Sequence, residues 1–269
     1  MSHKIAISLL CLKKIEDFDS FLMYLKKEKI KLVELPITKF FHNYQIDKIK
    51  LKEFKKKLNY NKIRVSSIQA IFHGINNLTV FNQNQSLKIL DHLKRVIKIS
   101  KCLKTKILIF GSPKMRKLKP KNKKKQIMNA IKLFKKISKL CEKNNIKFCI
   151  EPNAKYYGCN YINSIKESLE LQKKINSKNF LINVDTGNVS LEKEKLNNYF
   201  NQRNFFANFQ ISAKNLGDIR YSKFDHLSIL RKFNLKNKVI SLEMRDQKLS
   251  NLKSQIKFFK KIIKNLNYV

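Results

Sequence analysis

The sequence predicts an α/β fold, a (β/α)8 TIM barrel in a single domain that spans residues 1–269. Three observations predict this fold. Short apolar runs alternate with longer amphipathic stretches, there are eight such runs, and glycine falls just after several of them. Alternating strands and helices are typical of parallel β-α-β units, and a chain of this length accommodates the eight units that close a barrel.

The expected strands are the eight apolar runs, at residues 4–9, 31–36, 64–72, 106–113, 147–153, 180–187, 205–212 and 239–245. The segments between them carry apolar residues at three- and four-residue spacing, as in 86–103 and 123–145. That spacing predicts helices that bury one face against the strands. No interior linker or repeat indicates a second domain.

Glycine placement supports this order independently. The chain has only five glycines, and each lies near or just after the end of an expected strand: Gly74, Gly111, Gly158, Gly187 and Gly217. In a barrel, the loops that follow the strands build the active-site face. We therefore expect tight turns or a close approach to a ligand there, although strand-to-helix loops attract glycine in any protein.

The charge composition bears on the class of partner. The net charge is +40, but only seven of the 59 basic residues are Arg. Arg is the residue that favours bidentate contacts to phosphates and bases. Because lysines occur along every segment, we interpret the charge as a compositional bias and do not expect a nucleic acid partner. The positive field still favours the approach of a phosphorylated small substrate.

Other sequence signals concern location and cysteine chemistry. No apolar run reaches the length of a membrane span, and the N-terminal apolar stretch is too short for a secretory signal. The five cysteines contain no CxxC pair, which indicates neither a disulfide framework nor a structural zinc site. We expect a cytoplasmic protein without a membrane partner, and the sequence leaves open whether it forms a homo-oligomer.

Polar residues at the ends of apolar strands are the strongest functional signal. Four of them come from successive expected strands and are separated by 34, 25 and 33 residues, about one β-α unit each: Glu151, Asp185, Gln210 and Glu243. Burying charge without a partner is costly. Three carboxylates and an amide oxygen at one end of a barrel therefore predict one divalent cation, Mg²⁺ or Mn²⁺. For any one of these residues alone, a strand-end turn is the alternative.

These motifs resemble those of the xylose isomerase-like TIM barrels, a superfamily of sugar and sugar-phosphate isomerases and epimerases. The resemblance runs through VELP, VSSIQAIFHG, LIFGSPKMR, IEPNAKYYGCNYI, VDTGN, FQISAKNLGDI and SLEM. It implies that Glu151, Asp185, Gln210 and Glu243 bind the metal, and that Glu151 and Glu243 are the catalytic acid and base. The implied reaction isomerises or epimerises a sugar or sugar phosphate through an enediolate.

Further positions are candidates for substrate binding. Lys114 and Arg116 follow the fourth expected strand, where they would suit a phosphate or carboxylate, with a solvated basic loop as the alternative. His73 follows the third strand, and Asn188 stands where many relatives carry His. The remaining candidates for hydroxyl recognition or substrate contact are Glu34, Gln69, Asn153, Tyr157 and Arg220.

Three other functions stay open at this point. A keto-sugar or cyclitol dehydratase would begin with the same proton abstraction. An endonuclease IV-like DNA repair enzyme shares the barrel but resembles this chain less, because it uses several histidines and none of the five here lies at the sixth- or seventh-strand motif. A non-catalytic sugar-binding barrel would have no need for three converging carboxylates.

Overall fold

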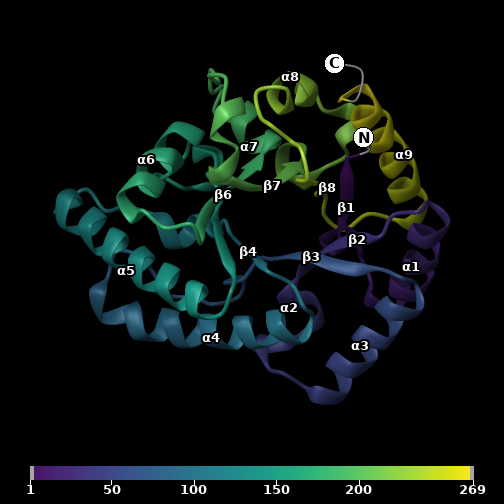
Figure 1. Ribbon diagram of the computed structural model, residues 1–269, viewed down its shortest axis with the longest axis horizontal. Coiled ribbons are helices and arrows are strands. Elements are labelled where there is room, and N and C mark those ends of the chain that lie inside the picture. Colours follow the sequence, from purple (N-terminus) through teal and green to yellow (C-terminus); the bar gives the residue numbers. More distant parts are fainter. Residues whose placement is uncertain (1–2, 267–269) are drawn as a thin grey trace.

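The computed structural model describes residues 3–266, apart from the side chain of residue 43 (Figure 1). Its strands are β1 (Lys4–Ser8), β2 (Leu32–Pro36), β3 (Arg64–Gln69), β4 (Ile107–Phe110), β5 (Lys147–Ile150), β6 (Phe180–Asp185), β7 (Phe206–Ile211) and β8 (Val239–Leu242). They pair in parallel and in sequence order, and β8 pairs with β1 to close the barrel. The predicted (β/α)8 barrel is confirmed.

Helices surround the strands on the outside of the barrel (Figure 1). They are α1 (Phe18–Lys27), α2 (Ile37–Phe40), α3 (Lys48–Tyr60), α4 (Ser86–Cys102), α5 (Lys123–Lys143), α6 (Ile165–Ile175), α7 (Thr186–Leu191), α8 (His226–Leu230) and α9 (Leu249–Leu266). Two short 3-10 turns, η8 (Lys214–Leu216) and η9 (Ile219–Tyr221), follow β7. Within residues 3–266, every helix is too short or too polar to cross a bilayer.

Local sequence explains where the longer helices form. In α4, the buried residues Ile89, Leu93 and Val96 recur every three or four positions, so they share the face that packs inward. Helix α3 begins at Asp47, whose carboxylate accepts hydrogen bonds from the main-chain N–H groups of Ile49 and Lys50 at 2.9 and 3.2 Å. Such an N-cap satisfies donors that a helix cannot satisfy internally.

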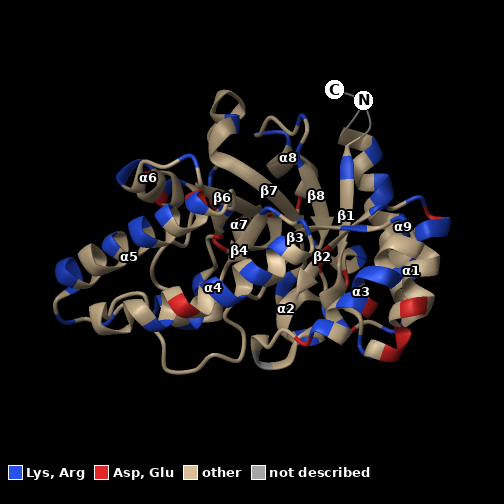
Figure 2. Ribbon diagram, turned by 60° about the horizontal axis from the view of Figure 1, so that its bottom comes forward, with Lys and Arg blue, Asp and Glu red and all other residues tan. Residues whose placement is uncertain are grey.

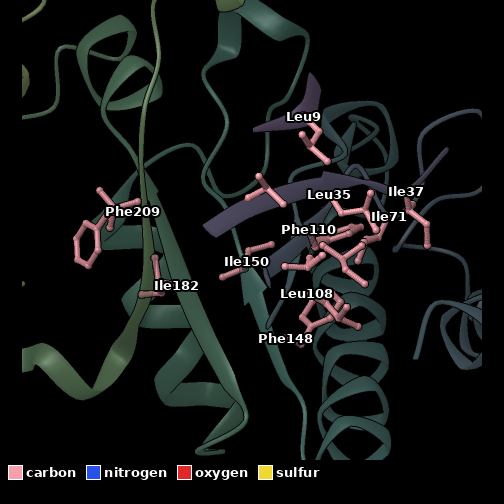
Figure 3. Close-up of a cluster of buried hydrophobic side chains, with 14 of the residues drawn as sticks. Leu9, Leu35, Ile37, Ile71, Leu108, Phe110, Phe148, Ile150, Ile182 and Phe209 are labelled. Atoms are coloured by element: carbon pink, nitrogen blue, oxygen red, sulfur yellow. The ribbon is translucent and has the colours of Figure 1, made fainter. Parts of the chain in front are cut away.

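The main hydrophobic core lies between strands and helices. Figure 3 shows Leu108, Phe110 and Phe148 on neighbouring strands, directed toward an adjacent helix. Phe134 of α5 meets this layer, with its ring centroid 6.0 Å from that of Phe110 and 5.5 Å from that of Phe180. Aromatic side chains bury large areas, so this layer fixes α5 against β4, β5 and β6.

The observed strands end earlier than several of the apolar runs. The third run was expected to continue to residue 72, but β3 ends at Gln69 because Ala70 adopts a left-handed conformation with φ of 54°. Strand β4 ends before Ser112, which is also left-handed, with φ of 46°. The fifth and eighth strands are also shorter than their apolar runs. Glu151 and Glu243 therefore lie one residue beyond β5 and β8, whereas Asp185 and Gln210 lie within their strands.

Candidate active site

Three carboxyl groups lie near one another at the C-terminal end of the barrel. Glu151 Oε1 accepts hydrogen bonds from the side-chain amides of Asn153 and Asn188, at 2.8 and 3.1 Å. Glu151 Oε2 accepts a third bond, from Asn183 Nδ2 at 3.1 Å. The Glu151 carboxylate is therefore held in a defined position by neutral donors, which neutralise none of its charge.

Asp185 ends β6 and also begins α7. Its Oδ1 accepts hydrogen bonds from the main-chain N–H of Asn188 at 2.7 Å and from Ser212 Oγ at 2.9 Å. Its Oδ2 is buried and has no hydrogen-bond partner among the described residues. An unsatisfied buried carboxylate oxygen is costly, so this oxygen is available to a group that is not part of the chain.

Gly187 brings the start of α7 close to the end of β7. A Cβ at this position would lie 2.7 Å from the main-chain oxygen of Ser212 and would also meet the Ser212 hydroxyl, which hydrogen-bonds Asp185. Only a residue without a side chain allows this approach.

Gly187→Ala should therefore destabilise the fold by about 1 to 3 kcal/mol, the usual cost of forcing extra atoms into a packed site. Chemical denaturation measures this. Gly217→Ala is the milder control, because its Cβ would meet only the Lys214 carbonyl, at 3.2 Å. Equal free energies of unfolding for the two variants would contradict this explanation of Gly187.

Gln210 is held by two acceptors inside the barrel. Its Nε2 donates to Glu34 Oε2 at 2.9 Å and to Gln69 Oε1 at 2.8 Å. These bonds fix the orientation of the amide, because both hydrogens are engaged on one side. The Gln210 carbonyl oxygen is thereby turned toward Asn183, which also donates to Glu151.

The polar network continues below the carboxylates. Glu34 is fully buried and also accepts hydrogen bonds from Ser67 Oγ and Asn208 Nδ2, at 2.8 and 2.9 Å. Barrel interiors are usually filled by branched apolar side chains. Here, strand register instead places polar residues opposite one another: Ser8 with Glu34, Glu34 with Ser67, Asn183 with Asn208, and Asp185 with Gln210.

Several residues of this network were not identified from the sequence, among them Ser8, Ser67, Asn183 and Asn208. A signal was present, because residues two apart in a strand share one face. Asn183 precedes Asp185 by two positions, and Asn208 precedes Gln210 by two. The alternation of polar residues within apolar runs would have found both asparagines.

Burial and mutual repulsion raise the pKa of all three carboxyl groups. For Glu151 and Asp185 the largest cause is burial, and for Glu151 the charge of Asp185 comes next. Burial raises the pKa of Glu243 well above its usual value, and the charges of Glu151, Asp185 and Glu34 add to the effect. Arg116 offsets only part of this for Glu151. The site therefore concentrates negative charge with little compensation.

The donor set suits a divalent cation. Carboxylate and amide oxygens are ligands for Mg²⁺ and Mn²⁺, and Asp185 Oδ2 has no protein partner among the described residues. No three Cys, His, Asp or Glu side chains within residues 3–266 are already arranged to hold a metal ion. Glu151 Oε1 accepts two amide hydrogen bonds and Oε2 accepts one, so Oε2 keeps a lone pair that could bind a cation.

Arg116 requires a correction. It was expected on a loop that binds a substrate anion, but the structure buries it completely. Its guanidinium donates to the main-chain oxygens of Gly111, Glu151, Tyr161 and Ile162 at 2.8 to 3.1 Å, and to Asn153 Oδ1. A 3-10 turn over residues 113–116 directs the side chain inward. Arg116 therefore holds the loops that carry Glu151 and Asn153, and it has no exposed surface for a substrate.

Lys114 and Arg220 form no hydrogen bond with the three carboxylates in the described part of the chain. Lys114 is exposed and lines a recess between the loops before α4 and α5, beside Lys117 and Asn82. Arg220 in η9 forms a bidentate ion pair with Asp218, with contacts of 2.6 to 3.1 Å. That pair occupies the guanidinium edge that a substrate anion would need.

The remaining predicted residues fall into two groups. Asn153, Asn188 and Tyr157 surround the carboxylates: the two amides hydrogen-bond Glu151, and the charges of Asp185 and Glu243 help to raise the pKa of Tyr157 after burial. Glu34 and Gln69 lie deeper, inside the barrel. His73 is exposed in the turn after β3 and lines a separate pocket.

The positively charged side chains of the chain lie mainly outside the barrel (Figure 2). Figure 2 shows Lys and Arg spread along the outer helices, while several acidic segments lie among the strands. The acidic centre is thus surrounded by a basic exterior. Such a field increases the rate at which small anionic molecules approach the barrel.

Comparisons with known proteins agree with this architecture. A family model described as a xylose isomerase-like TIM barrel matches residues 23–262. The structure of D-psicose 3-epimerase from Clostridium cellulolyticum H10 is similar, with 14% identity, a TM-score of 0.69 and coverage of 97% of this chain and 99% of that chain. No curated protein matches the chain.

Two further solved structures share the fold. An AP endonuclease, family 2, from Brucella melitensis has 12% identity, a TM-score of 0.77 and coverage of 96% of this chain and 98% of that one. The 3-keto-D-glucoside 4-epimerase from E. coli has 12% identity, a TM-score of 0.75 and coverage of 97% and 98%. At identities of 12 to 14%, the structural similarity shows only that these proteins share the fold of this chain.

Proposed function

The chain belongs to the xylose isomerase-like TIM barrel family, and from that premise we propose that it is a divalent-metal-dependent isomerase or epimerase of a sugar or sugar phosphate. One Mg²⁺ or Mn²⁺ would be held by Glu151, Asp185, Gln210 and Glu243. Glu151 and Glu243 would carry the proton. Two of the similar structures are those of sugar epimerases, which agrees with this proposal.

The observation that carries the proposal is the unsatisfied Asp185 Oδ2 among three carboxyl groups with raised pKa. A purely structural site would pair such groups with Arg or Lys. Arg116, whose charge lowers the pKa of Glu151, instead donates its hydrogen bonds to main-chain oxygens and to Asn153. The carboxyl groups are therefore left with little compensating charge from the chain, and a cation from solution would favour their deprotonated forms.

The chain's own residues can perform the proton transfer. The pKa of Glu151 is raised to about 8, and that of Glu243 is raised well above its usual value. A carboxyl group accepts and returns a proton most efficiently when its pKa is close to the working pH. Asn153 and Asn188 orient Glu151, and Glu243 approaches from β8. When bound, a divalent cation supplies Lewis-acid polarisation of the sugar carbonyl. Tyr157 and the amide of Asn188 lie beside the carboxylates and are the groups that we propose to contact sugar hydroxyls.

The two other candidate reactions of this fold differ from the proposed one either in their metal ligands or in their product. Of the histidines, His92 hydrogen-bonds the Ile71 carbonyl at 2.6 Å and His226 hydrogen-bonds Thr186 Oγ1 at 2.8 Å. Both imidazoles thus serve local packing, and the amide and carboxylate ligands favour sugar chemistry over a histidine-rich zinc cluster. A dehydratase would use the same proton abstraction and is distinguished by its product.

Deuterium incorporation tests the proposal. The protein is incubated in D₂O with a panel of ketoses and ketose phosphates, with Mn²⁺ or with EDTA, and the sugars are examined by NMR. We expect metal-dependent exchange at a carbon beside the carbonyl, together with a second sugar isomer. Loss of water from the sugar would identify a dehydratase, and the absence of exchange with every panel member would contradict the proposal.

Stability should depend on pH in a direction set by the carboxyl groups. The pKa of Glu151 is raised from 4.5 to about 8 in the fold, so the folded state binds more protons than the unfolded state between these values. The contribution of Glu151 to stability is then greatest at low pH and falls as pH rises. In EDTA, Tm should fall between pH 5 and pH 8, a window set by that shift.

Mn²⁺ should reverse this trend, because a cation binds the deprotonated carboxylates. We expect the Mn²⁺-induced increase in Tm to be larger at the alkaline end of the window than at the acid end. Glu151→Gln removes one of the titrating groups and should flatten the slope measured in EDTA. A metal-free Tm that does not change with pH would contradict the described electrostatics.

A further inference from the structure

A second pocket lies at the same end of the barrel, over β1, β2, β3 and β8. Its volume is about 590 Å³. Its wall includes Pro36, the last residue of β2, together with Leu10, Ala70 and Arg245, which follow β1, β3 and β8. Ala70 directly follows Gln69, and Arg245 comes two residues after Glu243. The pocket therefore lies close along the chain to Gln69 and Glu243, which belong to the polar network of the candidate active site.

The polar lining of this pocket is mostly cationic or hydrogen-bond-donating. It includes Thr38, Lys39, His42, His73 and Arg245, and its acidic member is Asp246. Asp246 is paired with Lys39, whose Nζ lies 3.1 Å from Asp246 Oδ1 and also donates to the main-chain oxygens of Leu10 and Leu12. That ion pair neutralises the one carboxylate, so the excess charge of the pocket comes from Arg245.

Three of the side chains that could donate hydrogen bonds into this pocket have no partner within the described part of the chain. Within the described part of the chain, the side chains of Arg245, His42 and His73 form no hydrogen bond or ion pair, and all three residues are exposed. The turn that presents His73 is itself fixed, because Tyr44 donates its hydroxyl hydrogen to the carbonyls of Ala70 and His73, at 3.1 and 2.7 Å. The fold thus positions a guanidinium and two imidazoles around a cavity without assigning them a partner.

We propose that this pocket binds the phosphate group of a phosphorylated sugar whose carbonyl end lies at Glu151 and Glu243. The inference rests on the proposed function and names its substrate class. A phosphate accepts several charge-assisted hydrogen bonds from donors that surround it, which suits Arg245, His42, His73 and Thr38. Binding energy from such a remote group can accelerate the reaction at the other end of a substrate.

This assignment replaces the anion site expected from the sequence. Arg116 is buried and engaged, and Lys114 lines a different recess. Arg245 was not singled out from the sequence, because it follows β8 as an isolated basic residue among many. Closure of the barrel brings it beside the turns after β2 and β3.

Binding of inorganic phosphate to the metal-free protein tests the pocket independently of catalysis. The protein is kept in EDTA, and phosphate is added while the imidazole signals of its five histidines are followed by NMR. We expect the signals of His42 and His73 to shift, and those of His92 and His226, which bond within the fold, to stay. His42→Asn and His73→Asn assign the two signals.

Arg245→Gln should weaken phosphate binding about 10- to 100-fold, the usual range for loss of a charged hydrogen-bond donor. Arg203→Gln is the matched control, because Arg203 is exposed in the turn before β7 and lies outside the pocket. Equal binding by the two variants, or shifts spread over all histidines, would overturn the assignment.

Substrate pairs then separate this inference from the proposed function. For a ketose and its phosphate ester, we expect a higher kcat/KM for the ester and a selective loss of that advantage in Arg245→Gln. Exchange with the unphosphorylated ketoses alone would leave the proposed function in place and overturn the phosphate pocket. Phosphate binding at His42 and His73 without exchange of any sugar would support the pocket and contradict the proposed function.

Discussion

Glu243→Gln should lower the rate of deuterium exchange into the substrate by about 10²- to 10⁴-fold, the range that positioned acid-base groups contribute. Glu243 lies one residue beyond β8, and burial together with three neighbouring carboxylates raises its pKa well above the usual value. Glutamine keeps the shape and an oxygen ligand, but it cannot accept a proton. The loss should therefore appear in kcat at saturating Mn²⁺.

The comparison for this variant is Glu53→Gln, the same change on the exposed face of α3. It should exchange deuterium at the wild-type rate. Circular dichroism and Mn²⁺ binding establish that Glu243→Gln is folded and loaded before rates are compared. A loaded Glu243→Gln protein that exchanges as fast as wild type would show that another group carries the proton.

Glu34→Gln should weaken Mn²⁺ binding about 10- to 100-fold, the usual effect of losing a group that orients a metal ligand. The Glu34 carboxylate accepts hydrogen bonds from the side chains of Ser67, Asn208 and Gln210. A glutamine at this position would direct its own N–H₂ group toward that of Gln210. The Gln210 amide would then have to turn over, which presents its nitrogen instead of its oxygen to the site.

Ser67→Ala serves as the control for Glu34→Gln. It removes one donor to Glu34 but leaves both acceptors that orient Gln210. Calorimetry with Mn²⁺ should find near-normal affinity for Ser67→Ala. Introducing Gln210→His should reduce the effect of Glu34→Gln, because an imidazole nitrogen ligates without a fixed amide orientation. Equal affinities of wild type and Glu34→Gln would show that Glu34 does not position a ligand.

The barrel could be predicted from the sequence because each strand is a short apolar run and each long helix has one apolar face. The strand ends were less accurate. Ala70 and Ser112 adopt left-handed conformations that end β3 and β4, and neither residue type signals such a turn. This is why the third and fourth runs extend past the observed strands.

Some residues of the candidate site could be placed from the sequence and others could not, because their positions depend on loop conformation. Asp185 and Gln210 occupy neighbouring positions in the β6–β7 register, which the spacing of the apolar runs anticipates. The inward direction of Arg116 depends on the 3-10 turn at residues 113–116 and on carbonyls of the loop after β5. Contacts between loops from different β-α units leave little trace in local sequence patterns.

The central claim is that the C-terminal end of this barrel binds one divalent cation. Titration with Mn²⁺, with the free ion followed by EPR, tests it directly. The account predicts one Mn²⁺ per chain for the wild-type protein and a large loss of affinity in Asp185→Asn, which replaces the carboxylate whose Oδ2 has no partner in the described structure. Absence of Mn²⁺ binding by the wild-type protein, or unchanged binding by Asp185→Asn, would contradict the claim.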